Sequence, residues 1–182
     1  EMQDYSPVQY KILNQLFPCK KTILGDINQS VNPFSSSSLD TINQVIPNAE
    51  CMTMRKSYRS TWEITEFTKR INNNLDIEAI ERHGEEPRVK EFEQEEKEVA
   101  YLQHLIKAFR AGDLHSMGII CKTQEQANEL HRLLSSADKH IHLLEPSSVA
   151  FAGGVVITAA HLAKGLEFDH VVVPRANKQN YH

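Results

Sequence analysis

The feature that most constrains the fold is a series of short apolar runs in the second half of the chain, separated by helical patterns or polar turns. The runs cover residues 116–121, 141–144, 155–158 and 170–173. Between them, apolar side chains recur at helical spacing over 95–111, and Thr123 opens a helix to about residue 135 with the spacing of a capping box. Short apolar strands that alternate with helices are typical of a parallel sheet covered on both faces, so the sequence predicts an α/β fold.

The first half of the chain is predicted to hold less regular structure. Ser6 and Pro7 predict a capped helix that Pro18 ends, and residues 21–25 predict a short buried strand. Residues 51–56 have some strand character, and a capping box that begins at Ser60 predicts a helix over about 61–72. Residues 76–98 contain ten acidic and four basic side chains, which favours a solvated connecting segment over a site for a basic partner.

Composition and charge exclude several classes of protein. With 40% hydrophobic and 24% charged residues, the chain is ordinary for a globular domain, and it contains no apolar run long enough to span a membrane. A net charge of -4 argues against a strongly basic nucleic-acid-binding module, although a motor domain that grips phosphates locally remains compatible with it. Cys19, Cys51 and Cys121 are predicted to be small buried residues of a reduced, cytoplasmic protein. Because the chain starts at Glu1 without a signal peptide, we expect an excised, monomeric piece of a longer protein.

Three polar clusters lie just beyond the predicted strands, where ligands bind in parallel α/β domains. They are GDINQ at 25–29, YRS at 58–60 and HLAKGLE at 161–167. Together they supply an amide, a guanidinium beside an aromatic ring, and a lysine with a carboxylate, all of which suit a phosphorylated ligand. Each cluster alone has an ordinary structural explanation, so the prediction depends on their order and spacing. His140 and His142 would share one strand face, but no third ligand is evident nearby, and no metal site is predicted.

The order of the clusters resembles the UvrD/Rep/PcrA branch of superfamily 1 DNA helicases over almost the whole chain. Residues 1–4 (EMQD) resemble the end of the DExQD box, 25–30 resemble motif III, and 58–60 resemble motif IV. Residues 156–168, VITAAHLAKGLEF, resemble motif V and carry the most specific match. The resemblance implies a RecA-like, P-loop NTPase-type three-layer fold with a mainly parallel sheet.

The resemblance also implies how the chain is divided and which residues act. Residues 1–50 would be a remnant of the first RecA-like domain, and residues 51–182 would be the second, truncated before motif VI, with ATP and Mg²⁺ bound between the two. Glu1 would orient the attacking water, Gln29 would sense the γ-phosphate, and Arg59 would act as an arginine finger. The other implied contacts are with ATP at Tyr58, Lys164, Gly165 and Glu167, and with DNA at Phe34, Thr158 and His161.

Two departures from the family pattern limit these expectations. The phosphate-binding loop GxxxxGK[ST] and the first aspartate of the DE pair are absent, so the chain by itself is expected to be inactive and to hold no ATP tightly. After Gln29, an aromatic-rich segment is replaced by VNPFSSS at 31–37, which leaves Phe34 as the candidate stacking ring.

The altered segment after Gln29, together with LAKGLEFD at 162–169, resembles the HelD branch of the family more closely. Members of that branch are associated with RNA polymerase. Three hypotheses stay open. The parent protein is an ATP-dependent helicase or translocase on single-stranded or duplex DNA, or an ATPase directed at RNA polymerase with reduced DNA unwinding, or a non-hydrolysing interaction module.

Overall fold

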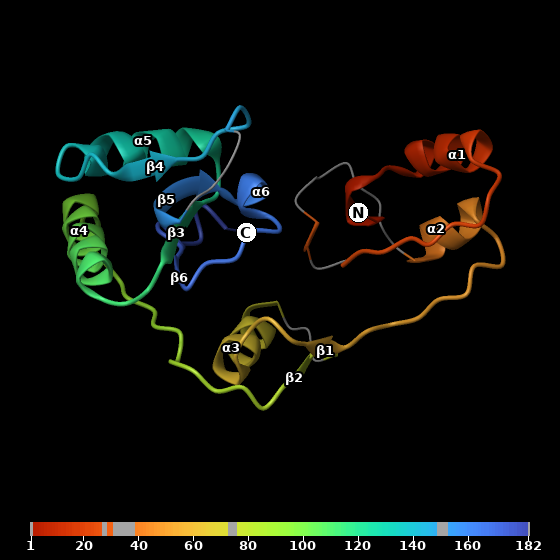
Figure 1. The fold of residues 1–182 in the computed structure, drawn as a ribbon, viewed down its shortest axis with the longest axis horizontal. Coiled ribbons are helices and arrows are strands. Elements are labelled where there is room, and N and C mark those ends of the chain that lie inside the picture. Colours follow the sequence, from red (N-terminus) through yellow and green to blue (C-terminus); the bar gives the residue numbers. More distant parts are fainter. Residues whose placement is uncertain (1, 27–28, 31–38, 73–75, 149–152, 182) are drawn as a thin grey trace. The chain divides into compact units, whose positions relative to one another are not determined.

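The computed structural model describes residues 2–26, 29–30, 39–72, 76–148 and 153–181 (Figure 1). The chain forms two compact units, a larger one made of Glu1–Ile42 with Phe92–His182 and a smaller one made of Asn43–Glu91. These units group segments by their contacts. The division into residues 1–50 and 51–182 therefore stays a prediction.

The larger unit is built on a four-stranded sheet. Its strands are β3 (Ser116–Cys121), β4 (Ile141–Leu143), β5 (Gly154–Ala159) and β6 (His170–Val172), in the order β4, β5, β3, β6 (Figure 1). All neighbours are parallel, and β3 pairs with β5 over its whole length, from Ser116 opposite Gly154 to Cys121 opposite Ala159. The parallel sheet predicted from the apolar runs is confirmed, with each strand within two residues of its predicted bounds.

The core of the larger unit lies between this sheet and two helices, α4 (Glu95–Ala111) and α5 (Gln124–Ser135). Alternate residues of the two central strands face the helices, and the residues between them are buried or half-buried on the other face, with Val156 1% exposed. Burial on both faces is why these strands are apolar throughout, and the α/β, RecA-like fold class is confirmed. The core side chains are Leu102, Ile106 and Phe109 from α4, Ala127, Leu130 and Leu134 from α5, and Met117, Ile119, Cys121, Ile141, Val155 and Ile157 from the strands.

One predicted cap of this unit forms only in half. The Thr123 hydroxyl accepts a hydrogen bond from Gln126 N at 3.3 Å, as a capping box requires. The Gln126 side chain does not return to the cap, because its Nε2 donates to Asn180 Oδ1 at 3.0 Å. The Gln126 amide that would complete the capping box is used instead in the long-range hydrogen bond to Asn180.

The N-terminal segment contains a short 3₁₀ helix, η1 (Met2–Asp4), and two helices, α1 (Pro7–Leu16) and α2 (Leu39–Val45). The predicted cap of α1 is confirmed, with Ser6 and Gln9 forming a complete capping box. The predicted buried strand at 21–25 is wrong, because this segment is irregular and Leu24 is 75% exposed. Met2 N donates to Leu24 O at 2.8 Å, but no strand among the described residues extends this contact into a ladder.

The cysteines and the helices bear on two further predictions. Cys121 is buried in the core as expected, whereas Cys19 and Cys51 are exposed in irregular segments, so the prediction of burial is wrong for these two. Within the described part of the chain, no helix is long and apolar enough to cross a membrane.

The smaller unit contains a two-stranded parallel sheet, β1 (Lys56–Ser57) and β2 (Glu78–Ala79), and one helix, α3 (Trp62–Asn72). Of the strand predicted over 51–56, only Lys56 lies in a strand, β1, and Met52 and Met54 are each 83% exposed. Helix α3 is confirmed to within one residue, but its cap is Thr61, whose hydroxyl accepts from Ile64 N at 3.4 Å, and not Ser60. The predicted connecting segment is only partly irregular, since it contains β2 and the first turn of α4.

Candidate functional site

The loop with the most specific sequence match follows the central strand β5. A short helix, α6 (Ala160–Ala163), leads into Lys164 and Gly165, and Leu166 N donates back to Ala163 O at 3.0 Å. Gly165 has φ +84°, which strains any residue with a side chain, so the shape of this turn depends on glycine. His161 and Glu167 are exposed on either side of the turn.

Thr158 is not available at this surface. It lies inside β5 with an exposed fraction of 0%, opposite Ile120 of β3. Its hydroxyl is covered in this structure. The expected DNA contact at Thr158 stays a prediction, and it would require the residues that cover this side chain to move.

The far end of the loop is fixed to the sheet by Phe168 and Asp169. Phe168 packs directly on Gly118 of β3, where an added Cβ would lie 2.7 Å from Phe168 Cδ2. Asp169 Oδ2 accepts from His115 N at 2.9 Å, Ser116 N at 2.8 Å and Ser116 Oγ at 3.0 Å. These bonds, that from His115 N first, hold the pKa of the Asp169 carboxyl below its usual value. Neither anchoring role was predicted from the sequence.

Lys164 is engaged by a residue far away in the sequence. Its Nζ lies 2.6 Å from Asp4 Oδ1, with side-chain exposures of 16% for Lys164 and 39% for Asp4. The hydrogen bond from Lys164 is the main reason that the pKa of Asp4 is lowered. The segment that resembles the DExQD box therefore contacts the loop that resembles motif V.

Gly25 and Asp26, at the start of the GDINQ segment, contact the same N-terminal residues. An added Cβ at Gly25 would lie 2.2 Å from Met2 Cβ, and Asp26 N donates to the buried Gln3 Oε1 at 3.0 Å. Gln29 is exposed, and its Nε2 donates to Asp26 Oδ2 at 3.0 Å. Gln3 is 1% exposed and supports this segment, a role that its place inside a recognised motif did not reveal.

Tyr58 and Arg59 lie in the smaller unit, in the loop between β1 and α3. Both are exposed, Tyr58 to 64%, so a ring and a guanidinium project from the loop. The loop backbone is held by Arg82, whose guanidinium Nη2 donates to the Arg59 carbonyl. Sequence reasoning missed Arg82 because it lies in the segment that was interpreted as solvated.

The structure thus divides the predicted site residues between the two units. His161, Lys164, Gly165, Glu167 and Gln29 belong to the larger unit, and Tyr58 and Arg59 belong to the smaller one. Glu1 and Phe34 lie outside the described residues. Their predicted roles stay predictions.

A charged cluster beside α3 makes the smaller unit sensitive to acid. Glu63 accepts from His83 Nδ1 at 2.8 Å and from Gly84 N at 2.9 Å. The bond from His83, followed by backbone N–H donors, lowers the pKa of Glu63 from 4.5 to about 2. A carboxylate with a lowered pKa stabilises the folded state above its unfolded pKa, and this contribution is lost as the pH falls through the folded pKa.

We therefore expect the stabilising contribution of Glu63 to the free energy of unfolding to be lost as the pH falls from 4.5 to about 2. Unfolding by denaturant at a series of pH values would measure it, with fluorescence of Trp62, the sole tryptophan, as the signal. Glu63→Gln should flatten the pH dependence in this window. Glu85→Gln is the control, because Glu85 is 88% exposed and pairs with exposed Arg88. A Glu63→Gln protein with the wild-type acid profile would contradict the expectation.

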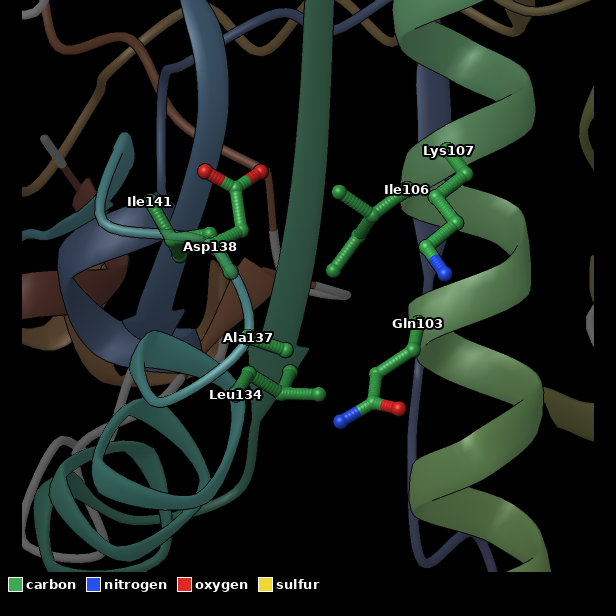
Figure 2. Close-up of a pocket in the computed structure, with 7 residues that line it drawn as sticks. All are labelled: Gln103, Ile106, Lys107, Leu134, Ala137, Asp138 and Ile141. Atoms are coloured by element: carbon green, nitrogen blue, oxygen red, sulfur yellow. The ribbon is translucent and has the colours of Figure 1, made fainter.

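A cavity of about 120 Å³ lies elsewhere in the larger unit, between α4 on one side and α5 and β4 on the other (Figure 2). It is smaller than the roughly 300–1,000 Å³ typical of ligand sites, and it contains none of the predicted site residues. In the described part of the chain, no three His, Cys, Asp or Glu side chains are grouped as metal ligands would be. The cavity is lined by Gln103, Ile106, Lys107, Leu134, Ala137, Asp138 and Ile141.

Comparison with known proteins identifies the type of domain. No protein-family model and no curated protein matches the chain. A solved structure described as the C-terminal domain of a possible DNA helicase from Lactobacillus plantarum WCFS1 is similar, with 31% sequence identity and a TM-score of 0.50. The match covers 69% of this chain and 73% of that chain. The chain belongs to this family of helicase C-terminal domains.

For a helicase C-terminal domain, the RecA-like α/β fold is the expected one, and the prediction that this is helicase-derived is confirmed. The narrower assignments to the UvrD/Rep/PcrA or the HelD branch stay predictions. The domain places its most specific motif at the carboxyl end of a central parallel strand, which is where such sheets bind ligands.

Proposed function

We propose that this helicase C-terminal domain supplies half of an ATP site in a DNA-dependent motor. The observation that carries the proposal is the loop after β5, where Lys164, Gly165 and Glu167 follow a buried central strand. The loop is fixed at Asp169 and at Lys164, so its exposed groups are presented from a rigid base. Preorganised polar groups at such a position suit a phosphorylated ligand.

The residues fit part of a nucleotide and not the whole of it. Tyr58 has an exposed ring that can stack on adenine, Arg59 is an exposed cation for phosphate oxygens, and Glu167 can accept from ribose hydroxyls. Lys164 is paired with Asp4, so it would contact a phosphate only if that ion pair rearranged. The phosphate-binding loop GxxxxGK[ST] is absent from these 182 residues. The Asp26 carboxylate already accepts a hydrogen bond from the Gln29 side chain. ATP with Mg²⁺ would therefore bind only when another segment supplies the phosphate-binding loop and the metal ligands.

The resemblance assigns Arg59, in the smaller unit, and Gln29, in the larger unit, each to the transferred phosphoryl group. Arg59 would place a fixed positive charge opposite the phosphoryl oxygens, where charge spreads in the transition state. Gln29 would sense the same group through its amide, which Asp26 orients. The exposed imidazole of His161 remains available for a nucleic acid strand.

A second function, action on RNA polymerase by a HelD-like ATPase, is favoured by two observations. The segment after Gln29 has few aromatic rings for stacking on bases, and Thr158, one of the three expected DNA contacts, is buried. Both reduce the nucleic-acid surface that this domain can offer. A protein client would need less of that surface.

The two functions differ in what stimulates turnover. In a longer chain that includes the phosphate-binding loop, we expect single-stranded DNA to raise the ATPase rate strongly, and we expect the 182-residue chain alone to show no turnover. A coupled ATPase assay with and without DNA measures both. An ATPase rate that does not change when DNA is added, together with tight binding of RNA polymerase without DNA, would support the second function instead. Measurable turnover by the 182-residue chain would overturn the half-site proposal.

A further inference from the structure

A second segment of the smaller unit runs alongside the loop that carries Tyr58 and Arg59. It begins at β2, which pairs with β1 in parallel so that Lys56 lies opposite Glu78 and Ser57 lies opposite Ala79. Glu78 N also donates to Arg55 O at 2.9 Å. The backbone immediately before Tyr58 is therefore bonded to residues 78–79.

Arg82 continues this support on the other side of the loop. Its guanidinium Nη2 donates to the Arg59 carbonyl, and its own carbonyl accepts from Trp62 N at 2.8 Å. One residue thus bonds the loop backbone at two points that flank residues 60–61. Just beyond it, His83 Nδ1 and Gly84 N both donate to Glu63, which fixes the first turn of α3 to the same segment.

This bracing matters because Arg59 itself projects from an exposed loop. Fixing a backbone residue costs conformational entropy, and a loose loop would lose that entropy when the ligand binds. A displacement of about 1 Å at a reacting group can cost on the order of 10²-fold in rate. A loop that is already held by Arg82 presents the Arg59 guanidinium from a fixed Cα position.

We propose that Arg82 is a positioning residue for Arg59, and that the segment from Glu78 to Gly84 is the brace that holds the arginine finger loop. The inference rests on the proposed function for its effect on turnover, but its structural part concerns the loop alone. In this proposal Arg82 acts only through the Arg59 backbone and does not contact the nucleotide directly. It lies among the acidic residues that the sequence analysis assigned to a solvated segment.

The kinetic test compares three variants in a longer chain that includes the phosphate-binding loop. Arg82→Ala should lower kcat by about 10–100-fold, with KM for ATP changed by less than about threefold. Arg82→Lys should recover part of the loss, since an ammonium can still donate to a carbonyl. Arg88→Ala is the matched control and should have wild-type kinetics, because Arg88 is 81% exposed and pairs with the exposed Glu85.

Coupling to Arg59 separates positioning from a general effect on the fold. In an Arg59→Ala background, Arg82→Ala should reduce turnover by less than about twofold further, because its target is already gone. Losses that multiply in the double variant would overturn the proposal. Arg82 would then act independently of Arg59, as a residue that only stabilises the smaller unit does.

Hydrogen exchange in the same longer chain tests the structural part without turnover. In Arg82→Ala, the amides of residues 60–62 should exchange faster, while those of β3 and β5 keep their wild-type rates. Wild-type exchange at 60–62 would overturn the bracing role whatever the kinetics show. If Arg59→Ala leaves turnover unchanged while Arg82→Ala loosens the loop, the proposed function fails and the brace is upheld.

Discussion

Replacing Arg59 with alanine, in a longer chain that carries the phosphate-binding loop, is expected to lower ATP turnover by about 10³-fold. The affinity for ATP should change by less than about threefold, since the cation interacts most strongly with charge that develops in the transition state. Single-turnover kinetics and equilibrium binding of ATP measure the two effects separately. The exposed position of Arg59, on a loop bonded to Arg82, is what makes such a selective effect possible.

Arg70→Ala provides the matched control for Arg59. Arg70 is an exposed arginine of the same unit that lies over the Phe67 ring on α3, 5.8 Å from its centroid. Arg70→Ala removes one positive charge, as Arg59→Ala does, but should leave ATP turnover unaltered. If Arg59→Ala weakens binding and turnover to the same extent, Arg59 contributes to ground-state binding, and the arginine finger assignment is wrong.

The second large effect concerns the sheet that carries the β5 loop. Ile157→Ala is expected to reduce the free energy of unfolding of the larger unit by about 2–5 kcal/mol, because it removes buried methyl groups and leaves a cavity. Ile157 is 0% exposed and lies in β5 between β3 and β4. Denaturant unfolding followed by circular dichroism measures the loss.

Val171→Ala is the comparison for Ile157. Val171 belongs to β6 of the same sheet but is 52% exposed, so its truncation should cost less than about 1 kcal/mol. Equal losses for the two variants would show that position in the sheet, and not burial, sets the stability of this unit.

The elements that were predicted best are those whose own sequence determines their burial. Helices α4 and α5 have apolar side chains at helical spacing, strands β3 and β5 are nearly continuous apolar runs, and all four pack against the same core. The cap of α1 was equally predictable because Ser6 and Gln9 are three residues apart. In these places, short-range pattern and tertiary packing favour the same structure.

The failures have the opposite cause. Residues 21–25 contain only two adjacent apolar side chains, Ile23 and Leu24, and no strand among the described residues pairs with this segment. The burial of Thr158 was not foreseen, because the motif does not say which side chains of a strand its neighbours cover. Gln126 left its capping box for Asn180, which is 54 residues away. Each depends on a contact that no local spacing records.

The candidate site was predictable in part for the same reason. The loop around Gly165 follows from the strand that precedes it, whereas Arg82 reaches Arg59 through a backbone carbonyl 23 residues away. Such a bond uses no particular side chain at Arg59 and produces no recognisable pattern. Only the fold of the smaller unit reveals it.

The contact between Phe168 and Gly118 has a consequence for protein engineering. The ring occupies the space that a Cβ would need, so the KGLEFD segment and a glycine on the adjacent strand form one transferable module. Grafting the segment into another parallel sheet would succeed only where the host has glycine at the matching register, with a serine like Ser116 at the start of that strand to bond the aspartate. A host with valine there would push the ring out and lose the loop that it anchors.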